Sequence, residues 1–98
     1  MRYRHVNRVL QRIDENADYR GRYGANVVRA FRMRMQAIRA ATSEIDFYAM
    51  KSLHFEKLKG PRQHQRSLRL NQQFRLILEI ESDPQGHIVV VIDIEDYH

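Results

Sequence analysis

Two neighbouring stretches near the carboxyl end of this 98-residue chain alternate like β-strands, and they constrain the fold more than any other feature. In FRLILEI, Phe74, Leu76, Leu78 and Ile80 fall on one side and Arg75 falls on the other. The turn-forming segment SDPQG separates this stretch from HIVVVIDI, a nearly continuous run of β-branched residues. Such a run predicts a central strand that is covered on both faces at its start.

Two shorter stretches upstream extend the predicted sheet. RSLRL places Leu68 and Leu70 on one side, and the tight link of residues 71–73 joins it to the next strand as a hairpin. Before it, SLHFEKL is expected to form a short strand that ends at the turn KGPR, residues 59–62. Together these segments predict an antiparallel meander of three or four strands.

The amino-terminal part carries apolar residues at helical spacing. A short helix is expected after an initial strand at residues 2–5, with the apolar positions Val6, Val9, Leu10 and Ile13. The segment ADYRGRYG then predicts a loop, because it has two glycines and no apolar period.

A second helix is expected over VVRAFRMRMQAIRAA, with Asn26 as its cap. Its predicted buried stripe consists of Val28, Phe31, Met35 and Ile38. Four arginines are expected on its solvated faces: Arg29, Arg32, Arg34 and Arg39.

This order of elements predicts an α+β fold, in which two N-terminal helices pack on one face of a curved, mainly antiparallel sheet. A chain of this length has room for one hydrophobic core, so we expect a single domain over residues 1–98. The other face of the sheet is then open and is where a functional site is expected.

Composition narrows the functional classes. There is no cysteine, which excludes disulfides, thiolate nucleophiles and thiolate metal sites. The longest apolar run, Ile88–Ile92, is too short to span a bilayer, and MRYRHVNR is unlike a signal peptide, so a cytoplasmic location is expected. The net charge of +5 favours nucleic acid or an acidic protein as partner, although residues 79–96 contain six carboxylates and no Lys or Arg.

The last four residues, EDYH, hold groups that can transfer protons. His98 or Asp96 could act as a general base and Tyr97 or His98 as a general acid, while Lys59 and Arg75 could stabilise charge on a phosphate. This set suits RNA cleavage without a metal, in which the ribose 2′-hydroxyl attacks its own phosphate. The plain alternative is a solvated strand end and an outward-facing strand arginine.

No cofactor and no metal are expected. The remaining histidines of the second half, His54, His64 and His87, have no ligand-like spacing.

Three motifs in order carry a resemblance to a known family: LKG at residues 58–60, SLRLNQQFRL at residues 67–76 and the closing DYH. From about Val28 to its last residue the chain resembles the HigB branch of the RelE/ParE superfamily of bacterial toxins. The resemblance implies the RelE/ParE-like microbial RNase toxin fold and the activity of a ribosome-dependent mRNA interferase. The functional positions of the family fall on Lys59, Arg75, Asp96, Tyr97 and His98.

The resemblance also implies partners. A co-encoded HigA-like helix-turn-helix antitoxin would hold the toxin inactive, operator DNA would be bound only through that complex, and no membrane is involved. The ribosome and mRNA would be the targets, with RNA contacts expected from Lys57, Arg62, Arg66 and Arg69. For Arg4, Arg8 and Arg12, ribosomal RNA and acidic residues of the antitoxin are equally open as partners.

The chain departs from the family pattern at two places. Members with L-H-P-L-K-G have a histidine three residues before the lysine, where this chain has Glu56, and His54 lies two positions earlier. Many members have an aromatic residue where Arg66 stands. Two alternatives stay open. A ParE-like toxin that inhibits DNA gyrase shares the fold but has no need of DYH together with a cationic pair, and a degenerate toxin would only bind its antitoxin.

Overall fold

The computed structural model describes residues 1–97. Its strands are β1 (Arg2–His5), β2 (Glu56–Lys57), β3 (Gln65–Arg69), β4 (Phe74–Asp83) and β5 (Gly86–Asp96). Its helices are α1 (Arg8–Glu15), α2 (Ala25–Ala40) and α3 (Glu44–Ala49), with 3₁₀ turns η1 (Lys51–Leu53) and η2 (Gly60–Arg62).

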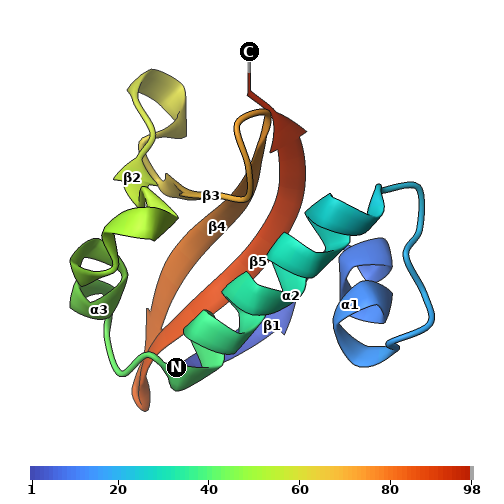
Figure 1. Ribbon diagram of the computed structural model, residues 1–98. Coiled ribbons are helices and arrows are strands. Elements are labelled where there is room, and N and C mark those ends of the chain that lie inside the picture. Colours follow the sequence, from blue (N-terminus) through green and yellow to red (C-terminus); the bar gives the residue numbers. More distant parts are fainter. Residues whose placement is uncertain (98) are drawn as a thin grey trace.

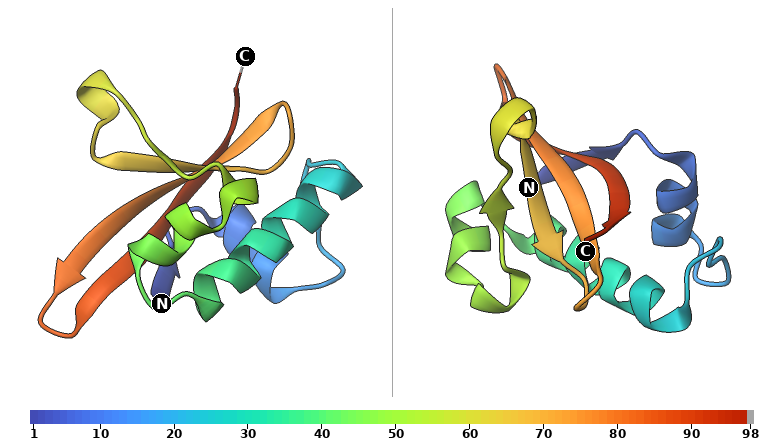
Figure 2. Two further views of the ribbon diagram at one scale, coloured as in Figure 1. Left: turned by 60° about the vertical axis from the view of Figure 1, so that its left-hand side comes forward. Right: turned by 90° about the horizontal axis from the view of Figure 1, so that it is seen from above.

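The strands form one sheet in the order β1-β5-β4-β3-β2. Strands β2 to β5 are antiparallel neighbours, whereas β1 pairs in parallel with β5. The sheet is strongly twisted, and α1 and α2 lie together against one of its faces (Figures 1 and 2). The predicted α+β architecture is confirmed, with β1 making the sheet larger than the expected meander.

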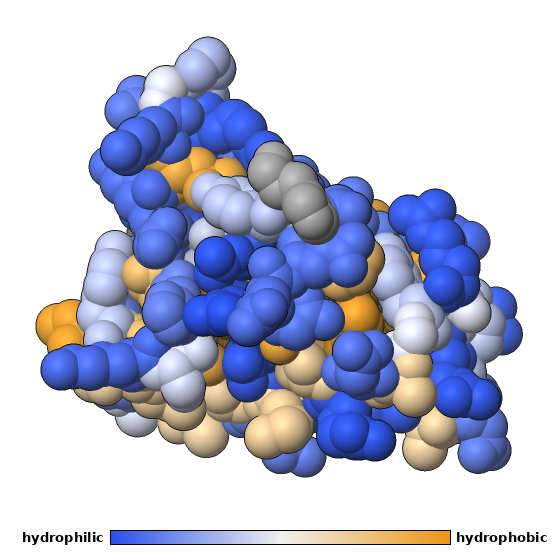
Figure 3. Space-filling model, turned by 45° about the horizontal axis from the view of Figure 1, so that its top comes forward, coloured by the Kyte–Doolittle hydropathy of each residue, from blue (hydrophilic) through white to orange (hydrophobic). Residues whose placement is uncertain are grey.

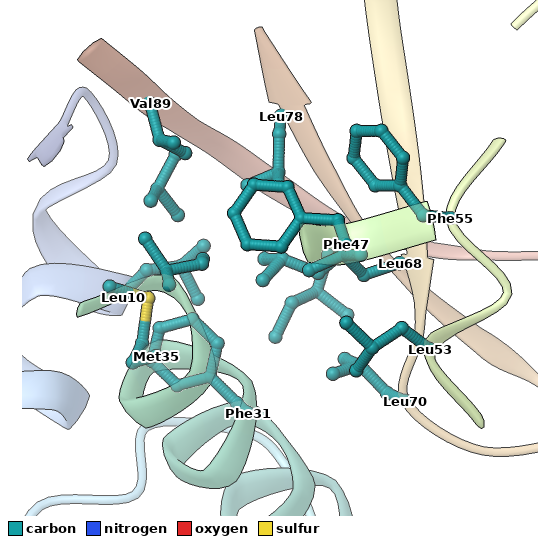
Figure 4. Close-up of a cluster of buried hydrophobic side chains, with 14 of the residues drawn as sticks. Leu10, Phe31, Met35, Phe47, Leu53, Phe55, Leu68, Leu70, Leu78 and Val89 are labelled. Carbon is teal, nitrogen blue, oxygen red and sulfur yellow. The ribbon is translucent and has the colours of Figure 1, made fainter. Parts of the chain in front are cut away.

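The core lies between α2 and the sheet (Figure 4). The predicted stripe of α2 is fully buried, and Leu76 and Leu78 of β4 face it from the sheet. The stripe predicted for the first helix is only half right. Leu10 and Ile13 are buried, but Val6 precedes the helix and is 52% exposed, and Val9 is 39% exposed.

The start of α2 differs from the prediction. Gly24 is the cap residue, and Asn26 lies within the first turn, where its side-chain oxygen accepts a bond from the Val27 amide. The expected cap was therefore wrong by two residues. The loop before the helix forms as predicted.

The segment after α2 was predicted least well. Residues 44–49 form the helix α3, which anchors itself in the core through Phe47 alone. SLHFEKL, expected as a strand, forms instead the turn η1 and the two-residue strand β2. A helix of six residues with one buried side chain shows too little periodicity to be recognised.

Two arginines of α2 do not face solvent as expected. The guanidinium of Arg32 donates to four carbonyls at and beyond the end of α1, those of Ile13, Asn16, Ala17 and Tyr19. Arg34 donates to the Arg69 carbonyl at 2.8 Å, and burial lowers the pKa of its guanidinium. These two arginines hold neighbouring elements against α2.

Strand β5 contains a β-bulge that decides which residues meet on the open face. Ile77 pairs with Asp93 and Leu78 pairs with Val91, so Ile92 is the extra residue. Val91 and Ile94 therefore both point into the core although they are three residues apart. The bulge shifts the alternation by one residue and turns the positions after it to the opposite face.

Candidate functional site

The open face carries a row of charged residues near the end of β5. Arg75 on β4 lies opposite Arg69 on β3 and opposite Glu95 on β5. Residues directly opposite one another share a face of the sheet, so these three side chains are neighbours. The bulge makes this possible, because without it Glu95 would face the helices.

Arg75 is the central residue of this row. Its guanidinium carbon lies 4.8 Å from the centre of the Tyr97 ring, a cation–π contact. Its Nε and Nη1 atoms are buried, and no hydrogen-bond partner for them exists among residues 1–97. Buried charged donors without a partner are costly, so this guanidinium is an unusual feature of the open face.

Tyr97 is held just beyond the C-terminal end of β5, a strand in the interior of the sheet. Its amide donates to the Gln73 carbonyl at 2.6 Å, which fixes the backbone just beyond β5. The side chain is 44% exposed. Tyr97 therefore contacts Arg75 while part of it stays exposed to solvent.

Glu95 is engaged by Arg62 from the turn η2. Arg62 donates to both carboxylate oxygens, with Nη1 and Nη2 at 2.9 and 2.7 Å, and these bonds raise the pKa of its guanidinium. Its Nε donates to Gln65 at 2.9 Å. The pair ties η2, which directly follows Lys59, to the same end of the sheet.

The remaining predicted catalytic residues are not all brought together. Lys59 is exposed. Asp96 pairs with Phe74, which places it on the helix side of the sheet, and its carboxylate accepts a bond from Gln73 at 3.0 Å. His98 lies outside the described residues.

The four predicted RNA contacts differ in their availability. Lys57 is exposed on β2. Arg66 lies on the helix side, where its Nε donates to Glu44 of α3 at 2.9 Å, and Arg62 is paired as described. Arg69 is half-buried in the row beside Arg75.

His54 is the residue that sequence reasoning set aside. Its backbone is left-handed, with φ 46° and ψ 50°, and its Nε2 lies 3.3 Å from Nη1 of Arg69. Because a guanidinium only donates, the imidazole nitrogen is the acceptor in this contact. His54 thus adds a candidate base next to the charged row, and its altered spacing from LKG concealed it.

Viewed from the end where β5 finishes, the surface around the row is mainly hydrophilic (Figure 3). Within residues 1–97, no group of three or more His, Asp or Glu side chains is placed to hold a metal ion. No helix in the described part of the chain is long and apolar enough to cross a membrane.

Comparison with solved structures places the fold among bacterial toxins. The chain is similar to a YoeB/ParE toxin from Agrobacterium tumefaciens, with a TM-score of 0.61 and 15% identity over 100% of both chains. The family model of the RelE-like toxin of the type II toxin–antitoxin system HigB matches residues 3–98. Comparison with curated proteins gives no match.

The chain therefore belongs to the HigB-like family and is a toxin of a type II toxin–antitoxin system. Membership confirms the resemblance seen in the sequence. It also gives this protein one partner, an antitoxin.

Proposed function

We propose that this toxin is an endoribonuclease that cleaves mRNA during translation on the ribosome. A base removes the proton of a ribose 2′-hydroxyl, and the resulting oxygen attacks the adjacent phosphorus. The bond to the 5′-oxygen breaks, an acid protonates that leaving oxygen, and a 2′,3′-cyclic phosphate remains. No metal takes part in these steps.

The guanidinium of Arg75 is the observation that carries the proposal. Two of its donors are buried without a partner among residues 1–97, and its plane is supported by Tyr97. Arg75 as a whole is only half-buried, so a phosphate can approach the exposed part of its guanidinium and offset the cost of the unpaired charge. The charge of that phosphate grows as the pentavalent transition state forms. Lys59 and Arg69 supply further positive charge to the same phosphate.

Proton transfer is assigned to the groups around this arginine. Tyr97 has the exposure that an acid for the leaving oxygen requires, with His98 as the other candidate. The base is one of His54, His98 and Asp96, of which Asp96 faces the helix side of the sheet. Assigning it requires single variants of all three residues.

The proposed partners follow from the family. A HigA-like antitoxin with a helix-turn-helix domain holds the toxin inactive and connects it to operator DNA. The ribosome presents the mRNA in the cytoplasm, and Lys57 and Arg62 join Arg69 in contacting RNA. Arg66 lies on the helix side, where it is bonded to Glu44, and is left out of this set.

The test is a reconstituted translation system in which mRNA ends are mapped after adding toxin, with and without ribosomes. Arg75→Ala and His98→Ala are compared with the wild type, and Arg2→Ala serves as the control. Arg2 is exposed and pairs with Asp83 at 2.6 Å, away from the charged row. We expect both site variants to cleave at least about 10²-fold more slowly than the wild type, and Arg2→Ala to cleave at the wild-type rate.

The results distinguish three kinds of toxin. Cuts that need ribosomes and disappear in both site variants support the proposal. A folded wild-type protein that halts growth without cutting mRNA points to gyrase inhibition instead. A protein that neither cuts mRNA nor slows growth when expressed without its antitoxin is a degenerate toxin.

A further inference from the structure

A hollow of about 410 Å³ lies between α1 and the loop that leads to α2, apart from the charged row. It is lined by Asn7, Val9, Tyr19, Gly21, Arg22 and Tyr23. Its volume lies in the range of small-ligand sites and is sufficient for a nucleobase. Two half-exposed tyrosine rings and an apolar side chain offer it flat, partly apolar walls.

The loop is shaped so that its backbone forms one wall of this hollow. Gly21 has φ 59°, and a Cβ added there would lie 3.1 Å from Val9 Cγ1 and 3.7 Å from the Tyr19 ring. Only glycine fits this conformation without strain. The opposite wall is fixed by Asn7, whose side chain caps α1 and donates to Asp93 of β5 at 3.2 Å.

The arginines around the hollow lack the carboxylate partners that most arginines elsewhere in the described residues have. Five arginines on the sheet, on α2 and in the turn η2 are paired with carboxylates: Arg2, Arg4, Arg39, Arg62 and Arg66. Five exposed ones on α1, the loop and α2 have no carboxylate partner among residues 1–97: Arg8, Arg12, Arg20, Arg22 and Arg29. The exposed acids of that region, Glu15 and Asp18, are fewer.

Two of these arginines lie against the tyrosines of the hollow. The guanidinium carbon of Arg12 is 3.9 Å from the centre of the Tyr19 ring, and that of Arg22 is 5.5 Å from the centre of Tyr23. A second hollow of about 380 Å³ lies between the loop and α2, and Arg20, Arg29 and Arg32 are among the residues that line it. Aromatic rings beside unpaired arginines are the combination with which proteins bind unpaired nucleotides.

We propose that this surface binds single-stranded RNA as a site separate from the cleavage site. One base enters the larger hollow against Tyr23 and the edge of Tyr19. Arg20 and Arg22 contact the flanking phosphates. The site goes beyond the proposed cleavage and does not depend on it, because it contains no residue of the charged row.

The test uses a fluorescein-labelled 2′-O-methyl RNA dodecamer, which has no free 2′-hydroxyl to attack phosphate, and a second probe of the same length without bases. Anisotropy gives the affinity as a function of salt. Tyr23→Leu keeps apolar bulk but loses the aromatic face, and Tyr48→Leu on α3 is its exposed control. The double variant Arg20→Ala/Arg22→Ala is compared with Arg2→Ala/Arg4→Ala, which removes the same charge from paired arginines.

We expect Tyr23→Leu to weaken the base-containing probe by about 5- to 100-fold and to leave the abasic probe unchanged. The loop double variant should weaken both probes and reduce the slope of log K against log salt by about 1.4, more than its control does. Equal binding by Tyr23→Leu and wild type, with circular dichroism showing an intact fold, would overturn the proposal. So would variants that bind both probes normally but no longer bind the antitoxin, which would assign the surface to that partner.

Discussion

Tyr97 has one observed contact and one proposed chemical role, which a single substitution can separate. Its ring supports Arg75 at 4.8 Å, and its hydroxyl is the proposed acid. Tyr97→Phe keeps the ring, so we expect unchanged RNA affinity but cleavage slower by about 10²- to 10⁴-fold. Tyr97→Leu should in addition raise KM, because Arg75 loses its support. Single-turnover cleavage on programmed ribosomes separates the two effects, and a fully active Tyr97→Phe would exclude the phenol as the acid.

His54 combines a strained backbone with an imidazole beside the charged row. A non-glycine residue in the left-handed region costs about 1–3 kcal/mol, and such residues concentrate at functional sites. His54→Gly removes both the strain and the imidazole. We expect a free energy of unfolding within about 1 kcal/mol of the wild type, or higher, because glycine adopts φ 46° freely.

Cleavage by His54→Gly should nevertheless fall by about 10²-fold if His54 is the base. His87→Gln, at an exposed histidine of β5, is the matched control and should cut normally. Cleavage at the wild-type rate by the glycine variant would leave His54 with a structural role only.

At the level of elements, the turn η2 is tied to the site by one ion pair. Arg62→Ala releases η2 and also frees Glu95, which lies opposite Arg75 and can then compete with phosphate for it. We expect about tenfold weaker RNA binding, with a stability change below about 1 kcal/mol because both side chains are partly exposed.

Adding Glu95→Ala separates the release of η2 from the competition by Glu95. Arg62→Ala/Glu95→Ala should bind RNA better than Arg62→Ala alone, because the competing carboxylate is gone. Double-mutant analysis of anisotropy data measures the difference. A double variant as weak as the single one would show that the loss of Arg62 itself, through its RNA contact or the order of η2, decides binding, and not competition by Glu95.

A buried polar cluster joins β1, α1 and α2 away from the site. Asp14 accepts from His5 Nε2 and from Arg39, both at 3.0 Å, and the side chains of Asp14 and His5 are each only 4% exposed. Asp14→Ala leaves the imidazole buried without this partner, so we expect about 3–5 kcal/mol of destabilisation in denaturant titrations. Asp14→Asn should cost less, and Glu15→Ala on the exposed side of α1 should be nearly neutral. A small effect of Asp14→Ala would mean that the cluster is open to water.

For the whole molecule, the sequence predicts burial well wherever a helical or strand pattern of apolar residues extends over a long segment. The stripe of α2 and the alternation of β4 predict burial correctly, because each repeats over enough residues to exclude the other period. The family motifs also selected Arg75 and Tyr97, which the structure places in contact.

The sequence could not show which residues share the open face. Ile92, Asp93 and Ile94 are compatible with two alternations, and only the pairing with β4 reveals the bulge that brings Tyr97 to Arg75. The structural use of Arg32 and Arg34 was equally hidden, since their partners are backbone carbonyls that have no signature in the sequence. His54 escaped because its spacing differs from the family motif by two residues.

The response of the whole fold to acid follows from two carboxylates in different parts of the molecule, Asp83 and Asp46, which are exposed and half-buried respectively. Hydrogen bonds from Arg2 lower the pKa of Asp83 at the turn between β4 and β5. The amide and hydroxyl of Thr42 lower the pKa of Asp46 where α2 leads to α3. Each folded-state pKa lies below the value of about 3.9 for an unfolded chain, so each carboxylate stabilises the fold fully above that value.

That stability is lost as the pH falls from about 5 through the lowered folded-state pKa values. Urea titrations between pH 7 and pH 2 should therefore show a declining free energy of unfolding. Asp83→Asn/Asp46→Asn should start lower at pH 7 and decline less steeply, because the unfolded double variant binds two fewer protons below pH 4. Asp18→Asn, at an exposed carboxylate with no ion pair within residues 1–97, is the control and should keep the wild-type slope. Parallel curves for the wild type and the double variant would show that neither contact persists in solution.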